Sequence, residues 1–140
     1  MWHKDFESRL ASWAELRSTV KNQPLEECLA NINLWWQRSP WQPFYLHWDD
    51  VSKWPDPWQL LADNVFCDVA KSLGMCYTIS MLNRNDHGPF ELIQTEDNYN
   101  LVHFIGEKYV LNMDSRSIVN TVPTNITRRL AQEQISKRCN

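Results

Sequence analysis

Apolar residues recur at three- and four-residue steps along the first 38 residues, and this spacing is interrupted once. The first series runs from Trp2 to Lys21, and a second begins after Pro24 and stops at Ser39-Pro40. Charged and small polar residues fill the positions between, a pattern that is typical of amphipathic helices. Because the connection between the two series is short, residues 1–38 are predicted to form a helical hairpin.

A longer apolar stripe begins at Asp56-Pro57 and reaches Gly74. Aspartate suits an N-cap, proline is tolerated at the first helical position, and glycine can take the left-handed conformation that ends a helix. Residues 56–74 are therefore predicted to form a central buried helix. The aromatic segment 39–55 before it has no helical period, and its prolines favour an extended path over the surface.

After Gly74 the pattern changes towards alternation. Residues 75–122 contain β-branched and apolar runs separated by turn residues, and two of these runs flank a predicted two-residue turn at Gly106-Glu107. They predict a four- or five-stranded antiparallel meander. Residues 124–138 are predicted to form a C-terminal helix. Its basic residues are expected to face solvent: Arg128, Arg129, Lys137 and Arg138.

These elements predict a single α+β domain over residues 1–140, with the helical hairpin and the central helix packed on one face of the sheet. Hydrophobic residues make up 43% of the chain and charged residues 22%, which is ordinary for a globular fold. The net charge of −3 gives no general attraction to nucleic acid or anionic lipid. Neither nucleic acid nor a membrane is an expected partner, since no apolar run approaches the ~18 residues of a membrane span.

Tryptophan is unusually frequent, with eight residues in the chain. Tryptophans bury a large area and bring one N–H group that needs a partner, so they could pack the core. They are also enriched at protein interfaces, so the same residues could bind a partner. Five of them precede the central helix and are the candidate interface residues: Trp35, Trp36, Trp41, Trp48 and Trp54.

The four cysteines contain no C-x-x-C pair, and no secretory segment precedes them. This favours reduced thiols in a cytosolic setting. One of them, Cys67, is followed by His103 and Asp114, which are the residue types of a thiol triad. The order resembles the transglutaminase-like and papain-like families, in which a helix carries the cysteine and an antiparallel sheet follows with His and then Asp or Asn. The resemblance covers about residues 64–114 and implies a cysteine hydrolase or acyltransferase.

Two geometric considerations weigh against this triad. In those families the cysteine lies in the first turn of its helix, where the helix dipole lowers the thiol pKa. A helix that begins at Asp56 places Cys67 three turns in, whereas a helix that restarts with Asp63 as its cap would restore the activation. The predicted hairpin also places Val110 opposite His103, so that Asp114 lies roughly 13 Å further along at ~3.3 Å per residue. We therefore expect a buried cysteine and a half-exposed strand histidine.

Other chemical motifs are weak. His47 lies beside Asp49 and Asp50, which are possible metal ligands, but their spacing matches no ligand signature. The chain has no glycine-rich phosphate loop, no H-E-x-x-H and no G-x-S-x-G. Neither a metal nor a cofactor is predicted.

A more specific resemblance covers Tyr45 to Thr78. The segments that carry it are Tyr45-Leu46-His47-Trp48-Asp49-Asp50, Trp54-Pro55-Asp56-Pro57-Trp58-Gln59-Leu60-Leu61-Ala62-Asp63-Asn64, Cys67-Asp68 and Leu73-Gly74-Met75-Cys76-Tyr77-Thr78. They resemble small uncharacterised proteins encoded by contractile-tailed bacteriophages. This resemblance implies a phage origin, a place in the virion or the host cytoplasm, and protein partners within a phage particle.

The sequence therefore favours a non-enzymatic structural or assembly protein of a tailed phage that binds other proteins through an aromatic surface. The alternative is a cysteine hydrolase or acyltransferase of transglutaminase-like type that uses Cys67, His103 and Asp114.

Overall fold

The computed structural model describes residues 2–43, 45–106, 109–114 and 116–139. In chain order the elements are α1 (Phe6–Val20), α2 (Leu25–Gln37), the 3-10 helix η1 (Trp48–Lys53), α3 (Pro57–Asp63), α4 (Asp68–Leu82), β1 (Phe90–Thr95), β2 (Asn100–Phe104), β3 (Tyr109–Leu111), β4 (Val119–Asn120), β5 (Ile126–Ala131), α5 (Gln132–Ser136) and the 3-10 helix η2 (Lys137–Cys139). The predicted α+β class is confirmed, and α1 and α2 form the predicted helical hairpin.

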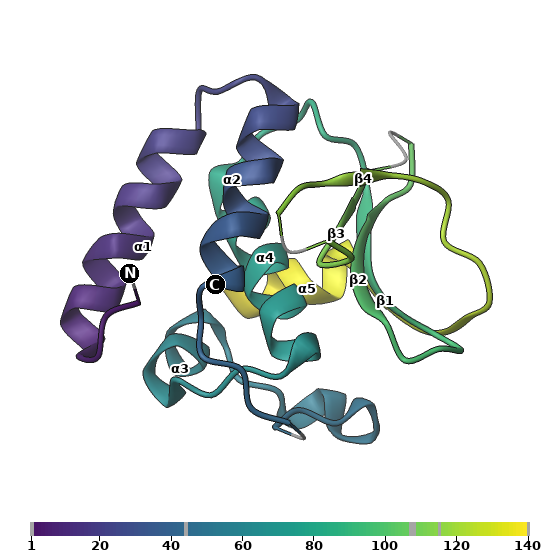
Figure 1. Ribbon diagram of the computed structural model, residues 1–140, viewed down its shortest axis with the longest axis horizontal. Coiled ribbons are helices and arrows are strands. Elements are labelled where there is room, and N and C mark those ends of the chain that lie inside the picture. The colour runs from purple at the N-terminus through teal and green to yellow at the C-terminus, as the bar shows by residue number, and fades with distance from the viewer. Residues whose placement is uncertain (1, 44, 107–108, 115, 140) are drawn as a thin grey trace.

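The elements lie in layers, with α4 between the helical hairpin and the sheet (Figure 1). The strand order is β4-β3-β2-β1-β5, and all neighbouring strands are antiparallel. Alternate residues of β1 and β2, such as Leu92, Val102 and Phe104, join the main core on the α4 face. Ile93, Leu101 and Val110 form a separate cluster on the other face. The two faces of each strand therefore lie in different surroundings, because successive side chains point to opposite faces of the sheet.

Helix α4 is buried on nearly every side, because α1, α2, α3, α5 and the sheet all contact it. Gly74, in its second turn, lies directly under the ring of Trp36 from α2. A Cβ atom at Gly74 would come within 2.5 Å of that ring, so only glycine lets the two helices approach this closely.

A single hydroxyl joins three helices at the centre of the core. The Oγ1 atom of Thr78 on α4 accepts hydrogen bonds from the indole N–H groups of Trp13 on α1 and Trp36 on α2, both at 2.9 Å. It also donates to the carbonyl of Gly74 at 2.8 Å. All three side chains are fully buried, so neither indole can reach water as a substitute partner.

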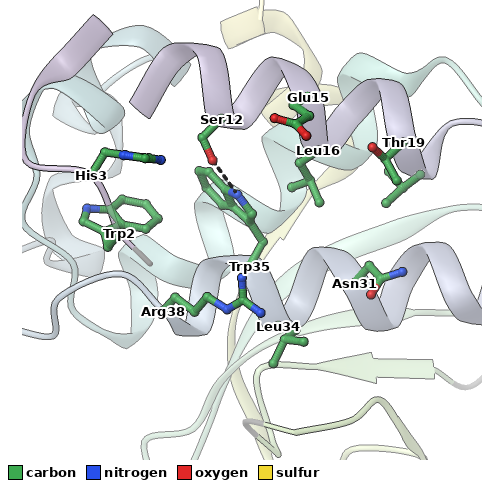
Figure 2. Close-up of a pocket in the computed structure, with 11 residues that line it drawn as sticks. Trp2, His3, Ser12, Glu15, Leu16, Thr19, Asn31, Leu34, Trp35 and Arg38 are labelled. Atoms are coloured by element: carbon green, nitrogen blue, oxygen red, sulfur yellow. Dashed lines mark hydrogen bonds between the residues drawn. The ribbon is translucent and has the colours of Figure 1, made fainter. Parts of the chain in front are cut away.

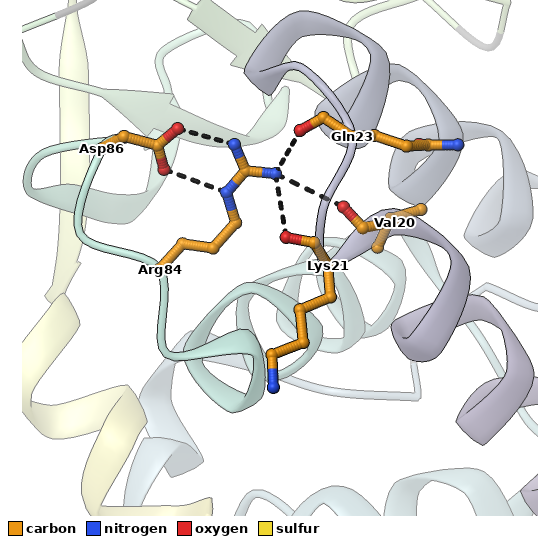
Figure 3. Close-up of polar contacts among 5 residues, drawn as sticks. All are labelled: Val20, Lys21, Gln23, Arg84 and Asp86. Carbon is orange, nitrogen blue, oxygen red and sulfur yellow. Dashed lines mark hydrogen bonds and ion pairs between the residues drawn. The ribbon is translucent and has the colours of Figure 1, made fainter.

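The loop after α4 is tied to the turn between α1 and α2. Figure 3 shows Arg84 between Asp86, which accepts from its Nε and Nη2 atoms, and three backbone carbonyls of the hairpin turn. The Nη1 atom donates to Gln23 at 2.6 Å and to Val20 at 3.3 Å. Arg84 therefore satisfies carbonyls that the end of α1 leaves without helical partners.

The predicted central helix 56–74 was wrong in extent. Asp56 does cap a helix with proline at its first position, but that helix, α3, ends at Asp63. Asn64 has a positive φ of 55°, which turns the chain away before α4 begins at Asp68. The stop signal is therefore this asparagine, while Gly74 lies inside α4.

The predicted sheet 75–122 and the predicted helix 124–138 were also misplaced. The run from Met75 to Leu82 is the second half of α4, and most of it is buried. A helix buried on all sides has no polar face, so its sequence lacks the helical period. The sheet instead extends to β5, which pairs with β1, and only residues 132–136 of the predicted C-terminal helix form α5.

The predicted turn at Gly106-Glu107 lies partly outside the described residues, because Glu107 is not among them. The strand register that it implied is nevertheless present, since His103 lies opposite Val110. Segment 39–55, predicted to be extended, contains η1 in its second half.

Substituting Gly74 tests the close approach of α2 and α4. Gly74→Ala should destabilise the fold by about 1–3 kcal/mol, because its Cβ must displace the buried ring of Trp36. Gly106→Ala is the matched control, since its Cβ meets nothing within 4 Å. Chemical denaturation of both variants measures the difference, and equal stabilities would contradict the close packing at Gly74.

Removing the Thr78 hydroxyl tests the shared hydrogen bonds. Thr78→Val leaves two buried indole N–H groups without an acceptor, and we expect a loss of about 2–5 kcal/mol in the free energy of unfolding. Thr78→Ser keeps the acceptor and removes one methyl group, so it should lose about 1 kcal/mol. If the valine variant is as stable as the serine variant, the hydrogen bonds of the hydroxyl do not contribute to the free energy of unfolding.

Candidate functional site: the cavity at the start of α4

Cys67 is the N-cap residue of α4, in extended conformation immediately before the first helical residue. The break between α3 and α4 creates this position, because Asn64 ends α3 and residues 65–67 run extended into the next helix. The sequence prediction placed Cys67 three turns into a helix and was wrong for this reason. The helix does restart, although Asp63 is the last residue of α3 and not the cap of α4.

The extended residues before α4 pair with segment 41–46. Trp41 and Phe66 form a parallel β-bridge, and the N–H group of Gln42 donates to the carbonyl of Phe66 at 3.0 Å. The N–H group of Leu46 then donates to the Sγ atom of Cys67 at 3.4 Å. Cys67 is only 7% exposed, so this segment covers the thiol and holds it in place.

A cavity of about 510 Å³ opens beside Cys67. Its lining comes from Trp41, Pro43 and residues 46–49, from Cys67 and the first residues of α4, and from Gln94, Asn98 and Asn100 at the adjoining ends of β1 and β2. Arg128 of β5 also lines the cavity, and its guanidinium pairs with Asp49 at 3.0 Å. The volume lies in the range of small-ligand and side-chain pockets.

The strands that reach the Cys67 end of α4 present amides. Asn100 lies at the start of β2, where its Oδ1 atom accepts from the indole of Trp48 at 2.9 Å. Asn112 follows β3, and its Nδ2 atom donates to the carbonyls of Asp68 and Asn100 and to the hydroxyl of Ser72. The Ser72 hydroxyl in turn donates to the carbonyl of Asn100 at 2.6 Å. The side-chain amide of Asn112 and the backbone carbonyl of Asn100 therefore connect the two strands to the start of α4.

His103 lies on the other face of the sheet. Its β2 neighbours Val102 and Phe104 point into the core against α4, so the alternation of the strand turns the imidazole away from Cys67. The Nδ1 atom lies 3.0 Å from the Oε2 atom of Glu91, which also accepts from Arg129 at 2.7 Å. The structure therefore gives His103 a carboxylate partner but not the thiol.

Asp114 makes its hydrogen bonds with residues outside the predicted triad. Its carboxylate accepts from the backbone N–H of Arg116, and its carbonyl accepts from Asn33 on α2. The structure thus brings none of Cys67, His103 and Asp114 into hydrogen bonding with another, as far as the described residues extend.

The five candidate interface tryptophans fall into different environments. Trp36 is fully buried and Trp54 is 6% exposed, so these two belong to the core. Trp41 is 60% exposed and lines the cavity together with the half-buried Trp48. Trp35 lines a separate hollow between α1 and α2, where Figure 2 shows its indole bonded to Ser12, with Glu15 and Arg38 on opposite walls.

The other three cysteines do not line this cavity. Burial raises the pKa of Cys28 and of Cys76, and it raises the pKa of Cys139 to about 11. All four cysteines are free in the structure. Cys67 is the one that borders the 510 Å³ cavity.

The aspartates near His47 do not gather with it into a metal-binding group, and no cluster of three His, Cys, Asp or Glu side chains occurs among the described residues. His47 instead lines the cavity with an exposed side chain, and its carbonyl accepts from the indole of Trp54 at 2.8 Å. None of the helices in the described part of the chain is long and apolar enough to cross a bilayer.

Sequence reasoning missed the three polar residues that anchor the cavity: Ser72, Asn100 and Asn112. Asparagine and serine are common in turns and at strand ends, so these residues carry no distinctive signal. Their shared position becomes visible only when β2 and β3 are placed against the first turn of α4.

The sequence matches no family profile and none of the curated proteins. Among solved structures the chain is similar to LapG of Legionella pneumophila, with a TM-score of 0.66. The match has 15% sequence identity and covers 89% of this chain and 74% of LapG. At this identity the similarity is one of fold alone.

Proposed function

We propose that this chain is a non-catalytic protein-binding domain with a transglutaminase-like fold, which holds its partner at the cavity beside Cys67. The observation that carries the proposal is the pair of amides at the Cys67 end of α4. A thiol nucleophile needs a base to take its proton and a third group to orient that base. Asn100 at the start of β2 and Asn112 directly after β3 lie beside the start of α4, and a carboxamide cannot accept a proton at neutral pH.

The competing function is a cysteine hydrolase or acyltransferase, the alternative reading of the sequence. The position of Cys67 at the start of a 15-residue helix favours it, because helix N-terminal N–H groups stabilise a thiolate. His47 lines the same cavity and is the imidazole best placed to act as a base. No hydrogen bond joins its ring to Cys67 in the described part of the chain, so the dyad would need a rearrangement of segment 41–47.

The exposed aromatic rim of the cavity supports the binding role. Trp41 lines the cavity with more than half of its surface accessible, and the apolar side chains of Leu46 and Val69 line the same cavity. A large exposed ring next to a hollow is the usual arrangement of an interface anchor. Trp48 also lines the cavity, and its hydrogen bond to Asn100 holds these two lining residues together.

We further propose that the partner belongs to a tailed-phage particle. This part rests on the resemblance of residues 45–78 to phage-encoded proteins. The same segment contributes Leu46, Trp48 and Cys67 to the cavity, so the resembling residues and the proposed binding site coincide. Mass spectrometry of purified virions tests it, and absence of the chain from virions and from assembly intermediates would contradict it.

Alkylation of Cys67 separates the two functions. At neutral pH the Cys67 thiol should react with iodoacetamide no faster than free cysteine in the same buffer, because no base takes its proton and Leu46 covers the sulfur. Peptide mapping by mass spectrometry assigns the reaction to Cys67, and Cys67→Ser is the control. Much faster alkylation that is lost in His47→Ala would overturn the proposal in favour of the enzyme.

Truncation of Trp41 tests the binding surface. The partner is first identified by mass spectrometry of proteins that co-purify with the tagged chain, and its affinity is then measured with purified components. Trp41→Ala should weaken binding by about 2 kcal/mol, roughly thirtyfold, without lowering the melting temperature. Trp58→Ala is the matched control, because Trp58 is also an exposed tryptophan but lies on α3 outside the cavity. Equal effects of the two variants would contradict a binding site at the cavity.

A further inference from the structure

Strand β5 lies at an edge of the sheet, with β1 as its neighbour. In an antiparallel ladder, alternate residues direct their N–H and C=O groups away from the partner strand. Thr127, Arg128 and Arg129 are all exposed, and no second strand pairs with β5 among the described residues. An open edge of this length is a template for a further strand.

The two arginines on this strand point to opposite faces. Arg128 pairs with Asp49 on the α4 side, and Arg129 pairs with Glu91 on the outer side. Their side chains remain 44% and 58% exposed, so each guanidinium still presents donors to solvent. An added strand would therefore meet a positive charge on either face.

This charge pattern distinguishes between occupants of the edge. A second copy pairing antiparallel through its own β5 would set arginines beside arginines, and like charges on neighbouring strands are destabilising. Nucleic acid is disfavoured by the net charge of −3. A strand that carries carboxylates at successive positions places one on each face and complements both arginines.

We propose that β5 binds an acidic, extended segment of another protein, which adds to the sheet as a sixth strand. This edge meets the cavity only at Arg128, which lines it, whereas Arg129 lies on the opposite face of the sheet from α4 and outside the cavity. Backbone hydrogen bonds to β5 supply the affinity, and the two arginines select acidic side chains.

The test begins with selection of displayed random decapeptides against the intact protein. Selected peptides should be enriched in adjacent Asp or Glu residues, and amide exchange of residues 127–130 should slow when a synthetic copy is bound. Arg129→Glu should lower its affinity at least tenfold, whereas Lys53→Glu, the same charge change on η1, should leave it unchanged. Trp41→Ala should also leave it unchanged, which distinguishes this site from the cavity.

N-methylation of the peptide backbone keeps the test decisive even if Arg129→Glu disturbs the fold. Methylating alternate residues blocks the hydrogen-bond donors of one edge only. One of the two alternate sets should abolish binding and the other should preserve it. The proposal is overturned if neither methylated set abolishes binding. It is also overturned if the selected peptides lack acidic residues, or if a DNA decamer binds the same edge in preference to them.

Discussion

The fold depends on the two hydrogen bonds that Thr78 accepts from the indoles of Trp13 and Trp36. These bonds fix α1 and α2 on α4 at one point, and the absence of a side chain at Gly74 lets Trp36 reach it. Buried polar groups tolerate little displacement, since a small shift would leave an indole N–H unpaired. The rotation of α4 about its axis is therefore set, and with it the direction in which the cavity at its first turn opens.

The helical hairpin and the overall α+β class could be predicted because their signals are local. α1 and α2 each combine apolar spacing with a clear break at Asn22–Pro24. The break between α3 and α4 gave no such signal, since Asn64 lies inside an apolar stripe that continues with helical spacing. The second half of α4 looked like a strand because burial on all sides removes the polar face from the sequence.

The candidate site was harder to predict, since it depends on which face of each strand meets α4. Cys67 was recognised as the residue of interest, but its place at a helix start follows from the chain turning at Asn64. His103 has the right type and sequence position, yet the alternation of β2 turns it towards Glu91. Asn100 and Asn112 matter through their contacts with the first turn of α4, which no pattern in a single sequence records.

The tryptophans have an optical consequence. Ring contacts at 4.9–6.0 Å join Trp2, Trp35, Trp36, Trp13 and Trp58 in series, and Trp48 and Trp54 form a separate pair at 5.1 Å. Excitation absorbed by any ring of the series passes readily to its neighbours, so their emission is shared. Trp41 has no ring contact with another described residue, and it is therefore an independent chromophore at the mouth of the cavity. A ligand in the cavity would therefore change the surroundings of Trp41 directly, whereas no ring of the series lines this cavity.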